Sequence, residues 1–111
     1  GLLGGRRATT HWLAHDHLAA LGAVPRDERV VFDGKYVTAA GVSAGIDMAL
    51  TLAARIADPA TAQAIQLGIE YDPQPPFSAG STASAPADIV ATMTAIRDFI
   101  LYGTAPPNSS R

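Results

Sequence analysis

Three histidines lie close together near the start of the chain, at positions 11, 15 and 17, and Asp16 lies between the last two. On a helix, His11 and His15 would share one face and could ligate a metal ion together. The residues before Trp12 are instead typical of a strand that leads into a loop, which breaks this spacing, and no fourth ligand is obvious nearby. We therefore expect no metal and no cofactor, with His15 and His17 at a solvated helix start.

His11 is a different case, because it follows a β-branched stretch that is typical of a strand. At the carboxyl edge of an open α/β sheet, side chains project into the crevice that such folds use for ligands. Two interpretations stay open at this point. His11 is either a catalytic histidine or a hydrogen-bonded histidine that packs beside Trp12.

A second candidate is a loop of small residues, Ala-Ala-Gly-Val-Ser-Ala-Gly at positions 39–45, which leads into a predicted helix. Such a loop lets backbone amides approach a ligand and directs the positive end of the helix at an anion or a developing oxyanion. Tight packing of a helix against a sheet is the more common use of these residue types. The loop has no lysine and lacks the spacing of a nucleotide P-loop, which excludes that kind of site.

Ser43 lies at the centre of a Gly-x-Ser-x-Gly pattern, the pattern of the nucleophile elbow in α/β-hydrolases. That elbow needs a strand-to-helix turn, followed along the chain by an acid and a histidine. Here the pattern follows a hairpin, and no histidine comes after Ser43. We therefore do not expect serine hydrolase chemistry.

The clearest structural signal is a β-hairpin, in which residues 29–32 and 35–39 flank Asp33-Gly34, a dipeptide suited to a type I′ turn. Before it, residues 6–11 are expected to form a strand that enters a sheet. Residues 16–22 then predict a short helix with Gly22 as its left-handed C-terminal cap. These elements would place His11 between a strand and a helix.

Three helices are predicted after the hairpin. The first follows Ser43 as N-cap, and its apolar residues recur at helical spacing, so we expect it to be largely buried. Asp58-Pro59 starts a second helix that runs to about Tyr71. Residues 73–86 predict a long loop that wraps across a surface or a partner subunit, and residues 86–101 predict the last helix. Residues 103–111 are expected to be a flexible tail.

Composition limits the classes of function. The chain has 111 residues and a net charge of −2, which leaves room for one domain or part of one and no basic surplus for binding nucleic acid. Its longest mostly apolar stretch, residues 46–57, is interrupted by polar and charged residues and is too short to cross a bilayer. The absence of cysteine excludes a disulfide framework and a cysteine nucleophile within these residues.

The predicted strands are too few to form a stable sheet with four helices around it. The first residues also lack a methionine and the features of a signal peptide. We therefore expect the chain to be a downstream portion of a longer protein.

Three segments carry a resemblance to a known family: Gly-Leu-Leu-Gly-Gly-Arg-Arg-Ala-Thr-Thr-His-Trp at 1–12, Gly-Val-Ser-Ala-Gly-Ile-Asp-Met-Ala-Leu at 41–50, and Ile-Gln-Leu-Gly-Ile-Glu-Tyr-Asp-Pro-Gln-Pro-Pro-Phe at 65–77. Together they resemble the C-terminal half of the DJ-1/PfpI superfamily and are most similar to its isonitrile hydratases. The first two motifs are also typical of the sensor-like domains of AraC-type regulators.

The resemblance implies an α/β fold. Residues 1–102 would form the C-terminal portion of a flavodoxin-like, class I glutamine amidotransferase-like, three-layer sandwich. Family members carry a cysteine on a strained strand-to-helix turn, which would lie upstream of Gly1, and an acidic residue nearer the N-terminus that hydrogen-bonds the thiol. His11 matches the histidine that many members place near this cysteine. The resemblance further implies that five residues line the pocket: Thr10, Trp12, Gly41, Val42 and Ser43.

Two functions follow from the resemblance. One is hydration of an isonitrile by a lyase, and the other is ligand sensing without catalysis, as in the AraC-type regulators. A regulator would continue into a helix-turn-helix region, whereas only a short tail follows the last predicted helix, which favours the enzyme. The resemblance also implies a cytoplasmic homodimer, completed by the N-terminal half of the same protein, that binds a small-molecule substrate and neither nucleic acid nor membrane.

Overall fold

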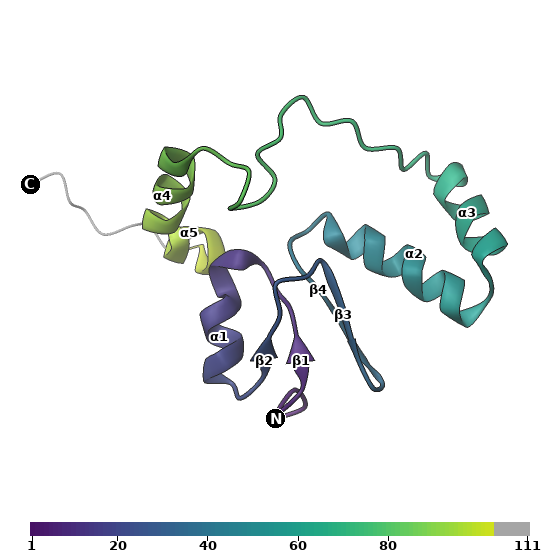
Figure 1. Cartoon of the computed structure of the whole chain (residues 1–111), viewed down its shortest axis with the longest axis horizontal. Helices are drawn as coiled ribbons and strands as arrows, with labels where there is room; N and C mark the ends of the chain where they lie inside the picture. Colours follow the sequence, from purple (N-terminus) through teal and green to yellow (C-terminus); the bar gives the residue numbers. More distant parts are fainter. Residues whose placement is uncertain (104–111) are drawn as a thin grey trace, which may run out of the picture. The chain divides into compact units, whose positions relative to one another are not determined.

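In the computed structural model, which describes residues 1–103, the chain divides into two units between Pro73 and Gln74, and each is described by itself (Figure 1). The first unit holds β1 (Arg7–Ala8), the 3-10 turn η1 (Trp12–Ala14), α1 (His15–Ala20), β2 (Val24–Pro25), β3 (Val30–Asp33), β4 (Tyr36–Ala39), α2 (Ala44–Ile56) and α3 (Pro59–Gly68). The second unit holds α4 (Ala87–Ala95) and α5 (Arg97–Tyr102).

β1 and β2 form a parallel pair that η1 and α1 connect (Figure 1). Arg7 pairs with Val24, and the Val24 amide donates to the Arg6 carbonyl at 2.7 Å. The predicted strand at 6–11 is therefore present but shorter, because the chain turns into η1 at Trp12. β2 was not predicted, since a two-residue strand that includes a proline has no alternating pattern to detect.

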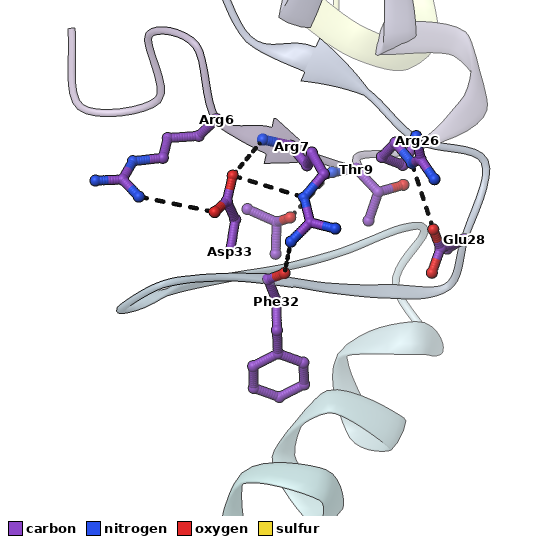
Figure 2. A network of polar contacts seen from close by, with 8 residues as sticks. Arg6, Arg7, Thr9, Arg26, Glu28, Phe32 and Asp33 are labelled. Atoms are coloured by element: carbon purple, nitrogen blue, oxygen red, sulfur yellow. Dashed lines mark hydrogen bonds and ion pairs between the residues drawn. The ribbon is translucent and has the colours of Figure 1, made fainter.

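The other edge of β1 is covered by side chains of the hairpin (Figure 2). The Arg7 amide donates to Asp33 Oδ2 at 2.7 Å, and the Thr9 amide donates to Thr38 Oγ1 at 3.0 Å. Figure 2 also shows the Arg6 and Arg7 guanidinium groups on the two sides of the Asp33 carboxylate, at 3.7 and 3.8 Å. Because side chains accept from these strand amides, the hairpin is held against β1 without a backbone ladder.

The predicted hairpin is confirmed, but its turn is shifted by one residue. Asp33 pairs with Tyr36, so the two loop residues are Gly34 and Lys35. Gly34 has a φ of 61°, and a glycine with positive φ at the first loop position is typical of a type II′ turn. The type I′ prediction was wrong because Asp33 stays in the strand, where its carboxylate accepts from the Arg7 amide.

The core of the first unit is small. Ala8, Leu18 and Ala23 form a buried cluster, against which Leu3 packs. This cluster anchors α1 to the parallel strand pair, because Leu18 belongs to α1 and Ala8 to β1. It thereby fixes the segment between them, which carries the three histidines.

α2 packs against α3 and the hairpin, and the Arg55 guanidinium lies over the Phe32 ring at 3.4 Å from its centroid. The prediction that this helix is largely buried was wrong for the described residues, in which Ala44 is its one buried residue. Ile56, at the end of the helix, is 82% exposed. Ser43 occupies the N-cap position as predicted, but its side chain makes no capping hydrogen bond.

α3 begins as predicted. Asp58 Oδ1 accepts from the Thr61 amide at 2.6 Å, and this hydrogen bond lowers the pKa of the Asp58 carboxyl. The helix ends at Gly68, before the predicted end at Tyr71, in a Schellman motif. In this motif the Tyr71 amide donates to the Gln66 carbonyl, and Glu70 takes a φ of 54°.

Glu70 occupies a left-handed position that favours glycine. We expect Glu70→Gly to raise the free energy of unfolding by about 0.5–1 kcal/mol, because the relief of roughly 1–2 kcal/mol of left-handed strain is partly offset by the greater entropy that glycine loses on folding. Chemical denaturation of the intact protein would measure the change. Glu70→Ala is the matched control, because it removes the same charge and keeps the Cβ. Equal stabilisation by both variants would show that charge, not backbone conformation, is responsible.

The second unit confirms the long loop, since residues 74–86 contain no helix or strand. The single predicted helix at 86–101 is instead divided into α4 and α5 at Ile96, which has φ −105° and ψ 20°. The Thr92 and Thr94 hydroxyls donate to carbonyls four residues earlier, at 2.9 and 2.8 Å, a bonding pattern that often bends helices. The tail predicted at 103–111 lies, beyond Gly103, outside the described residues. Across residues 1–103 we find no helix of the length and apolarity that crossing a membrane requires.

Candidate functional site

His11 lies in the short segment between β1 and η1, where its ring caps the 3-10 turn. His11 Nδ1 accepts a hydrogen bond from the Leu13 amide at 3.2 Å. Because Nδ1 is an acceptor here, the proton of the neutral ring resides on Nε2. The cap therefore leaves an Nε2–H group as the donor that His11 can present to a ligand.

Two further predicted residues surround this ring. Trp12 stacks on His11 with ring centroids 5.9 Å apart and an interplanar angle of 25°. Gly41 lies two residues after β4, and a Cβ placed on it would lie 3.4 Å from His11 Cδ2. Cδ2 is bonded to Nε2, so Gly41 borders the edge of the ring that carries the free donor.

Thr10 precedes His11 and contributes its backbone to the site. The Thr10 carbonyl oxygen lies 3.2 Å from His15 Nε2. The predicted helix start is confirmed, because His15 is the first residue of α1, and His17 is exposed as predicted. His15 itself is half-buried rather than solvated, because its side chain contacts the segment that carries His11.

The loop after Gly41 forms a tight turn before α2. The Ala44, Gly45 and Ile46 amides donate to carbonyls three residues earlier, at 2.9, 3.1 and 3.2 Å. These amides at the start of the helix are thus used within the loop. The side chains of Val42 and Ser43 are exposed, and Val42 is 96% exposed. Gly41 is placed against His11.

The histidine geometry does not resemble a metal site. His11 Nδ1 is occupied by the Leu13 amide, and His15 Nε2 by the Thr10 carbonyl. In the part of the chain that the structure describes, no group of three histidine, cysteine, aspartate or glutamate residues could hold a metal ion. His11 and His15 therefore each use one ring nitrogen in a hydrogen bond to the backbone.

A buried hydroxyl beside the site was not predicted. Thr9 is 3% exposed, and its Oγ1 has no hydrogen-bond partner among residues 1–103. The Thr9 backbone amide is bonded to Thr38, so the unpaired group is the hydroxyl alone. The sequence offered no signal for this, because burial of a threonine depends on the hairpin that covers it.

Asp47 in the first turn of α2 is the centre of a polar cluster that sequence reasoning missed. Its Oδ1 accepts from the Tyr71 hydroxyl at 2.6 Å, and its Oδ2 accepts from Arg29 Nε at 2.8 Å. The cluster ties the start of α2 to the residues before β3 and after α3. It thereby fixes the helix that follows Gly41.

These contacts shift two pKa values in opposite directions. The Tyr71 hydrogen bond, followed by Arg29, lowers the pKa of the Asp47 carboxyl, and the hydrogen bond to Asp47 raises the pKa of the Tyr71 hydroxyl. A lowered carboxyl pKa stabilises the fold at pH values above about 4, the ordinary pKa of an aspartate. This contribution is lost as pH falls through the folded-state pKa. A raised tyrosine pKa stabilises the fold at pH values below about 10, the ordinary pKa of a tyrosine. This contribution is lost as pH rises through the folded-state pKa.

We therefore expect Tyr71→Phe to destabilise the protein most between about pH 4 and pH 10 and least outside this window. Urea unfolding midpoints across the pH range would measure the difference from wild type. Asp47→Asn is the companion variant, because it should flatten the acid side of the profile. A constant difference between Tyr71→Phe and wild type at every pH would contradict the assignment.

The DJ-1/PfpI family model matches residues 1–55, the span that contains His11, Trp12 and Gly41. This chain belongs to the DJ-1/PfpI family. It is 54% identical over 90 residues to an isonitrile hydratase of Pseudomonas putida, covering 81% of this chain and 40% of that protein. The chain therefore spans about two fifths of the length of this DJ-1/PfpI relative.

A solved structure confirms the fold class. The crystal structure of a ThiJ/PfpI family protein from Pseudomonas syringae matches with a TM-score of 0.81 and 47% sequence identity, covering 84% of this chain and 38% of that chain. The predicted α/β, flavodoxin-like architecture and the resemblance to DJ-1/PfpI proteins are both confirmed. The parallel β1–β2 pair and the hairpin are thus parts of a DJ-1/PfpI fold.

Proposed function

We propose that His11 and the residues around it form one wall of the substrate pocket in an isonitrile hydratase-like lyase. Such an enzyme adds water to an isonitrile and yields an N-substituted formamide. The observation that carries the proposal is the His11 ring, whose Nδ1 is held by the Leu13 amide while its Nε2 edge lies beside Gly41. The 54% identity to a protein named isonitrile hydratase supports the choice of reaction.

The nucleophile of this reaction lies outside the 111 residues, which contain no cysteine. In the proposal, a cysteine upstream of Gly1 attacks as the thiolate. Its sulfur bonds to the terminal carbon of the isonitrile, and that carbon takes up one proton to give a thioimidate. Water then adds to the same carbon, the carbon–sulfur bond breaks, and the formamide leaves as the thiolate is restored. One water molecule is consumed overall.

His11 supplies a hydrogen-bond donor to this sequence of steps. Its Nε2–H can donate to charge that develops on the substrate or be the source of the proton that the carbon receives. Trp12 stacks on the ring and keeps its plane fixed, while Gly41 leaves space at the Nε2 edge because it has no side chain. Thr10, Val42 and Ser43 complete the proposed lining of the pocket.

The remaining features of the intact protein belong to the same proposal. Residues 1–102 would be the C-terminal portion of a DJ-1/PfpI domain whose N-terminal half contributes the cysteine and an acidic residue. We propose a cytoplasmic homodimer with a small-molecule substrate. These features are proposed because the chain belongs to the DJ-1/PfpI family and spans only about two fifths of a relative's length.

The test is turnover of a para-substituted phenyl isocyanide by the intact protein, followed as formation of the N-aryl formamide by chromatography. We expect formamide to accumulate over many turnovers and to stop after alkylation of the protein's thiols with iodoacetamide. Saturable binding of the isocyanide without formamide would contradict catalysis and favour the ligand-sensing function. Turnover that survives alkylation would contradict the thiolate mechanism.

A further inference from the structure

The hydrogen bond between His15 and Thr10 connects α1 to the peptide group that precedes His11. A carbonyl oxygen can only accept, so His15 Nε2 must be the donor across the 3.2 Å distance. The carbonyl belongs to the peptide that joins Thr10 to His11. His15 is half-buried, which limits the competition of water for this bond.

The peptide group after His11 is held as well. The His11 carbonyl accepts from the Ala14 amide at 2.8 Å, and His11 Nδ1 accepts from the Leu13 amide at 3.2 Å. Backbone amides of η1 donate two of these three hydrogen bonds. The third, to the Thr10 carbonyl, is donated by the His15 side chain at the start of α1. Without it, the Thr10 carbonyl would lose this partner, and the peptide before His11 would be held less tightly.

We propose that His15 is a positioning residue, which holds the Thr10–His11 peptide and so directs His11 Nε2 into the pocket. The effect of His15 on turnover rests on the proposed function. His15 touches neither the substrate nor the reacting atoms in this proposal. It acts through His11, because donors in an active site must be held within a fraction of an ångström to be effective.

Two variants of the intact protein test this role. His15→Gln keeps an amide N–H of similar reach that can donate to the Thr10 carbonyl, whereas His15→Leu removes the donor and keeps an apolar side chain of comparable bulk. We expect His15→Leu to lower kcat for phenyl isocyanide hydration by about tenfold with a KM within about twofold of wild type. His15→Gln is expected to recover most of the lost kcat.

A second readout does not depend on activity. Proton–nitrogen correlation spectra of the protein with labelled histidine report which ring nitrogen of His11 carries the proton. We expect the wild type and His15→Gln to show Nε2 protonated, and His15→Leu to show shifted His11 signals with a mixture of tautomers.

The outcomes separate this inference from the proposed function. If the wild type hydrates no isonitrile, the proposed function fails, and the His11 spectra still decide the role of His15. Unchanged His11 spectra in His15→Leu would overturn the positioning role. Equal loss of kcat in His15→Gln and His15→Leu would overturn it too, because the hydrogen bond would then not be the cause.

Discussion

Replacing His11 by alanine in the intact protein is expected to lower kcat/KM for isonitrile hydration by about 100-fold or more. The variant loses the Nε2–H donor beside Gly41 and also the cap that Nδ1 provides to η1. Both losses act on the same pocket, since η1 carries Trp12. Steady-state kinetics with a phenyl isocyanide would measure the effect.

His11→Asn separates the two roles. The asparagine side-chain oxygen can accept from the Leu13 amide as Nδ1 does, because asparagine is among the preferred helix-capping residues. It has no atom at the position of Nε2. We expect this variant to unfold at nearly the wild-type temperature and still to lose turnover as His11→Ala does. Near-normal turnover in His11→Asn would assign His11 a structural role only, in line with the alternative of a hydrogen-bonded histidine that packs beside Trp12.

The features that sequence reasoning predicted correctly are those determined by neighbouring residues. Asp58-Pro59 starts α3 because the aspartate accepts from an amide three positions later and the proline occupies the first helical position. The hairpin is equally local, since glycine at the turn permits the positive φ. Its turn type was missed because a distant amide, that of Arg7, keeps Asp33 in the strand.

The features that were missed depend on contacts between distant segments. The bonds from Asp47 to Arg29 and Tyr71 cross from one segment to another. The bond from His15 to Thr10 spans five residues, and it requires the chain to turn at η1, which no pattern indicated. The proximity of His11 and Gly41 could be expected only through the family resemblance, because the hairpin between them is compatible with many orientations.

The exposure of α2 illustrates a different limit. Its apolar spacing predicts one buried face, and the helix is present with a regular period. Periodicity shows that a face requires a partner but does not show which segment supplies it. The hairpin and α3 cover part of the helix and leave Ile56 exposed. We propose that the part of the DJ-1/PfpI fold not represented in these residues covers the rest.

The second large effect is expected at Gly41, where Gly41→Val should lower kcat/KM for isonitrile hydration by about 100-fold, while Gly41→Ala should lower it only a few-fold. A single Cβ at this position would lie 3.4 Å from His11 Cδ2, an ordinary contact distance that the ring can tolerate. Valine adds two methyl groups beyond that Cβ. They must displace the His11 ring or occupy the space through which the substrate reaches Nε2.

The cause is the space beside His11 rather than the backbone conformation of the loop. Gly41 does not have a positive φ, so the conformational freedom of glycine is not required there. Gly45→Val is the matched control, because a Cβ at Gly45 meets no atom within 4 Å and the residue lies four positions further along the same segment. We expect this control to keep turnover within a few-fold of wild type, since valine has a higher helix propensity than glycine and Gly45 lies in the first turn of α2. Equal losses at Gly41 and Gly45 would show that loop flexibility, not the approach to His11, governs activity.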